Sequence, residues 1–325
     1  MRLQDPLYGT VEVEPVMAAL LHTPPLQRLE RVHQAGAAAL LQPKWNVTRL
    51  EHSIGVMLLI RRLGGSLPEQ AAALLHDVSH TAFSHLVDQV LDHPDEDYHE
   101  KQLERVIKHP AIEEAIAPMG WKVEDLLPLE RWSILEQPAP DLCADRIDYT
   151  LRDQYHYGGL SLHEIHAFLE MLTLVQGRIA VRSLAWAEWF VDAYYREVVH
   201  FFLDPKNVYA NDRLSTVLRQ AMVEGVITED DWMKTDQKLL QQVKDRGGEA
   251  LLRDLSEIRP GIRLQISHPD DNWDIHFKQK VRWVDPLVIS KNGDIVRASQ
   301  LSTKIRNQTQ EAIERMKAGV YVRIV

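Results

Sequence analysis

The sequence predicts a mainly α protein, with an all-α body followed by a smaller α+β portion at the C-terminus. Apolar residues recur at helical spacing through the first two thirds of the chain, whereas the apolar runs after Pro260 have the length of strands. The dipeptide Asn292-Gly293 is typical of a hairpin turn between two such strands. We therefore divide the chain into a body of residues 1–204 and a C-terminal portion of residues 205–325.

The N-terminal elements are expected to be short. Residues 5–14 predict an extended or hairpin segment with its turn at Tyr8-Gly9, and residues 16–21 predict a short helix. Pro24-Pro25 opens a second helix, because proline is favoured in the first helical turn, where no intrahelical N–H bond is lost. Leu26 and Leu29 then follow at helical spacing.

The strongest helical signal lies in residues 49–63, where apolar side chains share one face and Gly64-Gly65 ends the pattern. Pro68 opens the next helix, whose apolar run 71–75 leads directly into His76-Asp77. Helical spacing recurs in residues 85–91, 98–107, 141–154, 162–174, 184–202, 209–224, 236–255 and 300–316. Strand-like runs cover residues 262–266, 281–284, 287–289, 295–296 and 320–325.

Composition and charge restrict the class of protein. The 325 residues are 45% hydrophobic, which favours a folded core, and no apolar run approaches the ~18 residues of a membrane span. The net charge of −10 argues against nucleic acid as a partner, although a few local cations suffice for a small anion. Cys143 is the single cysteine and no signal peptide is evident, so we expect a cytoplasmic protein.

Four side chains form a pattern suited to a divalent metal ion. His76-Asp77 ends an apolar helical run, His52 lies in the helix before it, and Asp145 lies in a later one. Two imidazoles and two carboxylates from three helices can hold an ion while leaving positions open for water and substrate. A buried aspartate is costly to desolvate unless it is paired, and a metal is a partner that all four side chains can share.

The same residues also allow an ordinary structural interpretation. A single histidine such as His52 is more often a core or surface residue than a ligand. Asp141, Asp145 and Asp148 fall on one face of a predicted helix, and such a carboxylate stripe is often a solvated face. Here apolar side chains flank the stripe, and three acids on one face repel one another unless cations lie among them.

Several blocks of the chain combine these residues in a fixed order. The blocks are residues 5–9 (DPLYG), 23–29 (TPPLQRL), 48–56 (TRLEHSIGV), 75–85 (LHDVSHTAFSH), 99–100 (HE) and 144–149 (ADRIDY). Over about the first 225 residues the chain resembles the HD-domain phosphohydrolases, and in particular the branch of deoxynucleoside triphosphate triphosphohydrolases that includes dGTPases and the animal SAM-and-HD-domain enzyme. The resemblance implies a helical HD-domain body that hydrolyses phosphoesters.

The resemblance also implies one divalent ion per subunit. The ligands that it implies are His52, His76, Asp77 and Asp145, with Asp148 as an outer or structural acid. Mn, Fe, Mg, Ni, Co and Zn are all compatible with such ligands, so the identity of the metal stays open.

Catalytic and substrate-binding residues follow from the same resemblance. His80 and His99 match the family's catalytic histidines, with Glu100 or Asp88 orienting them, and we favour His99 as proton donor or water orienter. His85 is as compatible with a structural hydrogen bond as with catalysis or substrate contact. The positions that match residues contacting the phosphates and the sugar are Gln34, Arg49, His85, Arg146, Tyr149, Asp153 and Tyr209.

The leading hypothesis is hydrolysis of a deoxynucleoside triphosphate to deoxynucleoside and inorganic triphosphate by a homo-oligomer. One departure bears on it: Tyr209-Ala210-Asn211-Asp212 stands where the family commonly has Tyr-x-His-Lys, so two cations are missing. A nucleoside monophosphate phosphatase is therefore an alternative. So are a phosphodiesterase with a second metal on His80, His85 and His99, and a non-catalytic nucleotide sensor. Base preference, an allosteric activator and the role of residues 226–325 stay open.

Overall fold

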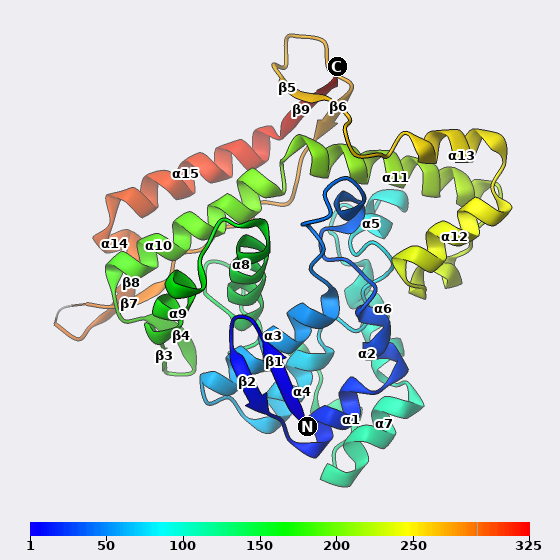
Figure 1. Cartoon of the computed structure of the whole chain (residues 1–325). Coiled ribbons are helices and arrows are strands. Elements are labelled where there is room, and N and C mark those ends of the chain that lie inside the picture. Colours follow the sequence, from blue (N-terminus) through cyan, green and yellow to red (C-terminus); the bar gives the residue numbers. More distant parts are fainter. Residues whose placement is uncertain (291) are drawn as a thin grey trace.

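The structure, a computed structural model, describes residues 1–290 and 292–325, and helices make up most of it (Figure 1). The α-helices of the body are α1 (Pro15–Leu21), α2 (Pro24–Leu29), α3 (Arg49–Arg62), α4 (Leu67–Leu75), α5 (Leu86–Val90), α6 (Tyr98–Ile107), α7 (Pro110–Ile116), α8 (Ala144–Tyr157), α9 (Leu162–Glu170) and α10 (Leu184–Tyr195). Its shorter helices are the 3₁₀ turns η1 (Gly36–Leu40), η2 (Ala117–Met119), η3 (Val123–Asp125) and η4 (Leu129–Arg131), and the π-helix η5 (Arg196–Phe201).

Strands and further helices complete the chain. The strands of the body are β1 (Arg2–Asp5), β2 (Gly9–Glu12), β3 (Leu172–Val175) and β4 (Arg178–Val181). The C-terminal helices are α11 (Pro205–Val223), η6 (Glu229–Met233), α12 (Asp236–Arg246), α13 (Glu249–Ser256), α14 (Ala298–Leu301) and α15 (Thr303–Ala318). The C-terminal strands are β5 (Leu264–Ser267), β6 (Ile275–Phe277), β7 (Leu287–Ile289), β8 (Ile295–Arg297) and β9 (Val320–Ile324). The predicted fold class, mainly α with a smaller α+β C-terminal portion, is confirmed.

Helices α3 and α4 pack against each other at the centre of the body. A capping box starts α3, because Thr48 accepts the Glu51 N–H and the Glu51 carboxylate accepts the Thr48 N–H. Helix α4 has Pro68 in its first turn, as predicted, and its apolar run 71–75 is fully buried. This burial brings the C-terminal end of α4, where His76 is the cap, next to the core instead of leaving it in solvent.

A buried ion-pair network holds α8 against α3. Arg152 on α8 donates from Nε and Nη2 to the two carboxylate oxygens of Asp148, at 2.9 and 3.0 Å, and both side chains are fully buried. The N-terminal hairpin joins this network, since Asp5 lies 3.0 Å from Arg152 Nη1 and the Tyr8 hydroxyl donates to Asp148. Gly55 on α3 makes the close approach possible because it has no side chain facing these groups.

A four-stranded sheet with the order β3-β4-β7-β8 connects the two portions of the chain. Strand β4 pairs in parallel with β7, although one lies before residue 204 and the other after it. Helix α15 also packs against α10 and η5. The proposed boundary at residue 204 stays a prediction, and strands from both sides of it share this sheet. A second sheet, β5-β9-β6, protrudes at the top of Figure 1.

Several predicted elements differ from the structure in their bounds. The helix predicted for residues 162–174 ends at Glu170, and its last residues form β3, which pairs with β4. The helix predicted for residues 236–255 is divided into α12 and α13 at Gly247-Gly248. The strand predicted for residues 281–284 is wrong. These residues lie in an irregular segment between β6 and β7, where Arg282 bonds to Glu96 instead of pairing in a sheet.

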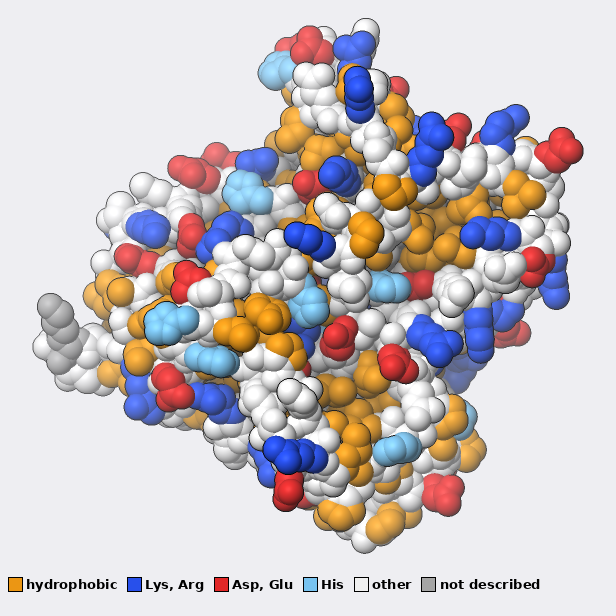
Figure 2. Space-filling view, viewed as in Figure 1, with side chains coloured by type: hydrophobic (Ala, Val, Ile, Leu, Met, Phe, Trp, Pro, Cys, Tyr) orange, Lys and Arg blue, Asp and Glu red, His pale blue; other side chains and the backbone are white. Residues whose placement is uncertain are grey.

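On the face shown in Figure 2, lysine and arginine side chains are interspersed with aspartate and glutamate side chains. On this face the mixture forms no broad basic surface. Across residues 1–290 and 292–325, no helix combines the length and the apolar character needed to cross a membrane.

The Gly55 contact generates a test of the packing of α3 against α8. A methyl group at residue 55 would lie 2.0 Å from Arg152 Nη2 and 2.1 Å from Asp148 Oδ2. We therefore expect Gly55→Ala to lower the free energy of unfolding by about 3 kcal/mol or more, because the buried ion pair must be displaced. Denaturant unfolding followed by circular dichroism measures this. Gly248→Ala, which meets no atom within 4 Å, is the control, and equal losses in both variants would contradict the argument.

Candidate active site

Three helices bring the predicted metal ligands together. His52 comes from the N-terminal end of α3, His76-Asp77 from the end of α4, and Asp145 from the first turn of α8. His52 Nε2 lies 3.0 Å from Asp145 Oδ1 and 4.0 Å from Asp77 Oδ2, and His76 Nε2 lies 3.7 Å from Asp145 Oδ1. The candidate ligand atoms of His52, His76 and Asp77 all lie within 4.8 Å of one another.

Both imidazoles are oriented by a contact at the other ring nitrogen. His52 Nδ1 lies 2.9 Å from Asp148 Oδ1, and His76 Nδ1 lies 2.6 Å from the Ala73 carbonyl oxygen. A neutral ring that donates from Nδ1 has its lone pair on Nε2, which is the arrangement of a metal-binding histidine. His76 Nε2 is moreover buried without a hydrogen-bond partner among the described residues. The residues present therefore fit a divalent ion.

Without a bound ion, neighbouring groups shift the pKa values of His52 and Asp145. Burial alone would lower the pKa of His52, but hydrogen bonds with Asp145 and Asp148 raise it to about 10. Burial would raise the pKa of Asp145, yet His52 and His76 hold it well below its usual range. In the metal-free protein His52 is thus protonated at neutral pH, and a metal ion must displace that proton.

Arg49 is a fixed cation beside the cluster. Its Nη1 donates to Asp77 Oδ2 at 2.8 Å, its Nε donates to Ser84 Oγ at 2.9 Å, and the side chain is buried. The other carboxylate oxygen of Asp77, Oδ1, lies 3.2 Å from His80 Nε2. Despite burial, the neighbouring His76, Arg49 and His80 hold the pKa of Asp77 well below its usual range, so this carboxylate stays ionised.

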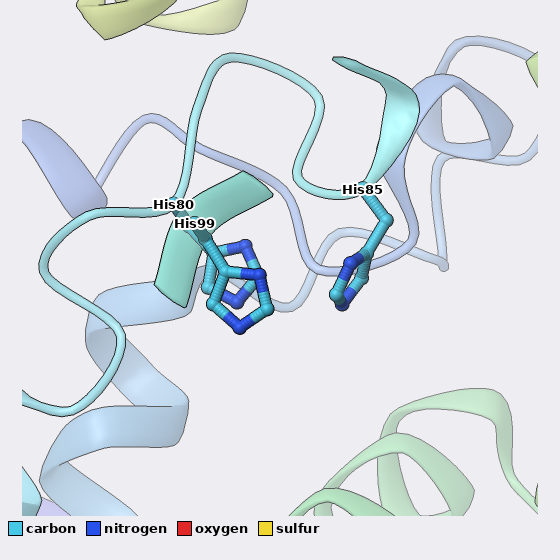
Figure 3. Close-up of side chains that lie close together, drawn as sticks. All are labelled: His80, His85 and His99. Atoms are coloured by element: carbon cyan, nitrogen blue, oxygen red, sulfur yellow. The ribbon is translucent and has the colours of Figure 1, made fainter. Parts of the chain in front are cut away.

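The predicted catalytic histidines form a second cluster (Figure 3). The rings of His80 and His99 stack with centroids 4.0 Å apart, and His85 stands nearly perpendicular to both at 4.8 and 5.0 Å. Burial and the nearby Arg49 lower the pKa of His80 well below its usual range. Burial and His85 lower the pKa of His99 to about 3. Both imidazoles are therefore neutral near pH 7.

Asp88 and Glu100 differ in what they contact. Asp88 Oδ2 lies 3.4 Å from His85 Nδ1, and Asp88 Oδ1 accepts the Tyr98 N–H at 3.0 Å. Asp88 therefore lies beside His85, and among the described residues it forms no hydrogen bond with His80 or His99. Glu100 lies on α6 directly after His99 and faces the cavity, where burial raises its pKa.

Two of the predicted sugar-contacting residues, Gln34 and Asp153, contact each other. Gln34 Nε2 donates to Asp153 Oδ2 at 3.2 Å, and Asp153 is buried. Burial raises the pKa of Asp153 to about 7. Behind it, Glu197 on the π-helix η5 is fully buried, and burial together with Asp153 raises its pKa well above the usual range. A neutral carboxyl group therefore backs Asp153 at this end of the site.

One cavity of about 1260 Å³ contains both clusters. All the predicted site residues line it except Asp88 and Tyr209. The structure does not bring Tyr209 to the cavity, because its hydroxyl donates to the Glu257 carbonyl at 3.2 Å on another side of α11. Asn207 and Asn211 line the cavity instead. They are one helical turn apart, and Tyr209 lies between them, about 200° around the helix from each.

The C-terminal portion contributes part of the cavity wall, which was not predicted from the sequence. Lys280, Arg282 and Trp283 line the cavity although no motif marks them. Glu136 was missed as well, and burial together with Asp145 raises its pKa to about 7. The available signal is one cation, Arg282, inside the apolar run Val281–Val284, with Lys280 directly before that run.

Comparisons with known proteins agree with this geometry. The HD domain family model matches residues 49–153. Over 299 residues the chain is 34% identical to the metal-dependent phosphohydrolase cns2 of Cordyceps militaris, covering 88% of this chain and 84% of that protein. It is 45% identical over 326 residues to YdhJ of Bacillus subtilis (strain 168), an uncharacterised protein, covering 100% and 99% of the two chains.

More distant matches agree as well. A crystal structure of a hypothetical protein from Aquifex aeolicus has the same fold, with a TM-score of 0.70 at 24% identity over 98% of this chain and 100% of that one. The human deoxynucleoside triphosphate triphosphohydrolase SAMHD1 is 34% identical over 101 residues, which are 26% of this chain and 16% of that protein. The chain belongs to the HD-domain metal-dependent phosphohydrolases, a family whose members use a divalent metal ion.

The protonated His52 generates a test of metal binding. At pH 7.5 we expect each Mn²⁺ ion that binds to release about one proton, because the pKa of His52 is about 10 in the metal-free protein. As pH rises through about 10 this release disappears, and the affinity for the ion increases up to that pH. Calorimetric titration in two buffers of different ionisation enthalpy measures the proton count. The exposed-site variant His268→Ala should leave it unchanged, whereas no proton release at pH 7.5 would contradict the assignment.

Proposed function

We propose that this HD phosphohydrolase cleaves deoxynucleoside triphosphates to deoxynucleoside and inorganic triphosphate, using one divalent ion bound by His52, His76, Asp77 and Asp145. The observation that carries the proposal is that a single cavity contains this cluster, the histidines His80, His85 and His99, and the polar pair Gln34 and Asp153. The partial similarity to the triphosphohydrolase SAMHD1 supports the nucleotide class of the substrate.

The bound ion would supply positive charge to the phosphoryl oxygens and make a water molecule more acidic. Arg49 adds a second, fixed positive charge beside it, because its guanidinium is held by Asp77 and Ser84. His80 is held in one orientation by Asp77, and His99 stacks on His80, so the imidazoles have defined directions. Since both rings are neutral, they can accept a proton from water and orient it; an incoming phosphate would raise the pKa of His99 and favour its role as donor.

The far end of the cavity suits a sugar hydroxyl group. Asp153 offers a carboxyl oxygen without a hydrogen-bond partner among the described residues, and Gln34 holds the other oxygen. Tyr149 lines the same region and its ring lies 6.4 Å from that of His52. A sugar bound here would place its phosphate-bearing side near the ligand cluster, which is the arrangement that hydrolysis at a nucleotide requires.

A nucleoside monophosphate phosphatase is the second candidate function. Two observations favour it. Carboxyl side chains outnumber lysine and arginine side chains along the cavity walls, and Asn211 donates to Asn207 and accepts the Ala37 N–H, so it serves as a structural contact. A substrate with one phosphate needs fewer cations than a triphosphate. Product analysis separates the two functions.

The first test identifies the substrate and the bond that is cleaved. Protein loaded with Mn²⁺ is incubated with each deoxynucleoside triphosphate and monophosphate, and the products are separated by ion-exchange chromatography. We expect deoxynucleoside plus inorganic triphosphate. Deoxynucleoside plus orthophosphate from monophosphates alone would support the second candidate, and no turnover of any nucleotide would overturn both. Sedimentation of the same sample tests the prediction of a homo-oligomer.

The second test concerns the imidazole of His99. Substitution His99→Gln keeps a polar side chain but removes the group that accepts or donates a proton, so we expect kcat to fall by about 10²–10⁴-fold. Metal content should be unchanged because His99 is not in the ligand cluster. His268→Gln, an exposed histidine, is the matched control. A His99→Gln protein that retains full kcat would contradict the catalytic role.

A further inference from the structure

We propose that Lys280 is a substrate-binding residue, whose ammonium group binds a phosphate group of the substrate beside His85 and His99. The inference rests on the proposed function only in assuming that the substrate carries a phosphate. Lys280 lies in the irregular segment between β6 and β7, a part of the chain in which no motif was found. It lines the same cavity as the ligand cluster and the histidines.

Contacts on both sides of Lys280 fix the backbone of this segment. Gln279 Nε2 donates to the Val198 carbonyl on η5 at 2.6 Å. Arg282 donates from Nη1 to the Lys280 carbonyl at 3.3 Å, forms an ion pair with Glu96 and lies over the ring of Phe202. Its neighbours therefore anchor Lys280, while its own side chain stays exposed. This arrangement holds a flexible cation at the wall of the cavity.

Most other cations of the cavity already have partners. Arg49 pairs with Asp77, Arg282 with Glu96, and Lys108 with Glu104. These pairs reduce the positive charge that each cation can offer to a phosphate.

Arg146 and Lys280 remain, and they differ. Arg146 Nη1 donates to the carbonyl oxygens of Gln137 and Asp141 at 2.6 and 2.9 Å, which holds its guanidinium against the backbone. Lys280 Nζ has one contact, to the Asp95 carbonyl at 3.4 Å, and within residues 1–290 and 292–325 it forms no ion pair. It is therefore the cation of the cavity that is most free to meet an anion.

The position of Lys280 relates it to the histidine cluster. Asp95, its contact, lies in the loop that leads into α6, and α6 presents His99 and Glu100 in its first turn. The positive charge of Lys280 acts on Glu100, where it opposes the rise in pKa that burial causes. The ammonium group therefore lies at the loop that leads into α6, the helix that carries His99 and Glu100.

Lys280 also offers a positive charge in place of the two cations that the family has at residues 211–212 and this chain lacks. Asn211 is used in holding Ala37 and Asn207, and Asp212 does not line the cavity. The C-terminal segment thus restores one positive charge to the cavity from a distant part of the chain.

The experiment measures binding of orthophosphate and of inorganic triphosphate to the full chain loaded with one equivalent of Mn²⁺, by calorimetry. We expect Lys280→Ala to raise the dissociation constant of at least one probe by about tenfold, because one charged contact is lost. Lys280→Arg should bind within about threefold of the wild type. Lys278→Ala is the matched control, since Lys278 is an exposed lysine of the same segment that does not line the cavity.

The outcomes separate this inference from the proposed function. Equal affinities in Lys280→Ala and the wild type, or equal losses in Lys280→Ala and Lys278→Ala, would overturn the role of Lys280. If the wild type binds the probes through Lys280 but cleaves no nucleotide, the proposed function fails and the inference stands. Where a nucleotide is cleaved, Lys280→Ala should raise KM far more than it lowers kcat, and an unchanged KM would again count against the role.

Discussion

The buried contact among Asp148, Arg152 and His52 is the constraint on which the site depends. Desolvating a carboxylate and a guanidinium costs more than their attraction returns unless their geometry is good and their remaining atoms are bonded. Here Arg152 contacts both oxygens of Asp148 and also Asp5, while Asp148 contacts His52 and Tyr8. The same contacts fasten α8 to α3 and turn His52 Nε2 towards Asp145, so fold stability and ligand orientation have one origin.

Around this network the protein places charge where phosphoester chemistry needs it. Asp77 and Asp145 stay ionised because cations and imidazoles surround them, whereas His80 and His99 stay neutral because burial and neighbouring positive groups disfavour another charge. A metal ion would replace the proton on His52 and leave the ligand carboxylates unchanged. The cluster of ligands and the cluster of neutral bases are thus kept chemically distinct although Asp77 contacts both.

The C-terminal portion is part of the site and of the fold. Asp141, just before α8, pairs with Arg178 on β4 and with Arg297 on β8, so one carboxylate joins strands from both portions. The segment between β6 and β7 then reaches across to the loop before α6 and completes the cavity wall. The same backbone therefore leads into the C-terminal sheet and forms part of the cavity wall.

Local sequence was sufficient for the helices and for the ligand set. Capping residues and helical periodicity identified α3 and α4, and the histidine and aspartate spacing, with the family resemblance, identified residues that the structure brings together. It was not sufficient where long-range contacts decide the outcome. Residues 172–174 have helical spacing but pair with β4, and residues 281–284 have strand composition but lie outside any strand, with Val281, Arg282 and Trp283 lining the cavity. The cations beside Asp141 and Asp148 are Arg152, Arg178 and Arg297, and tertiary structure alone brings the last two to Asp141. Periodicity records which face of an element is apolar, whereas partners distant in the chain determine where Lys280 and Tyr209 point.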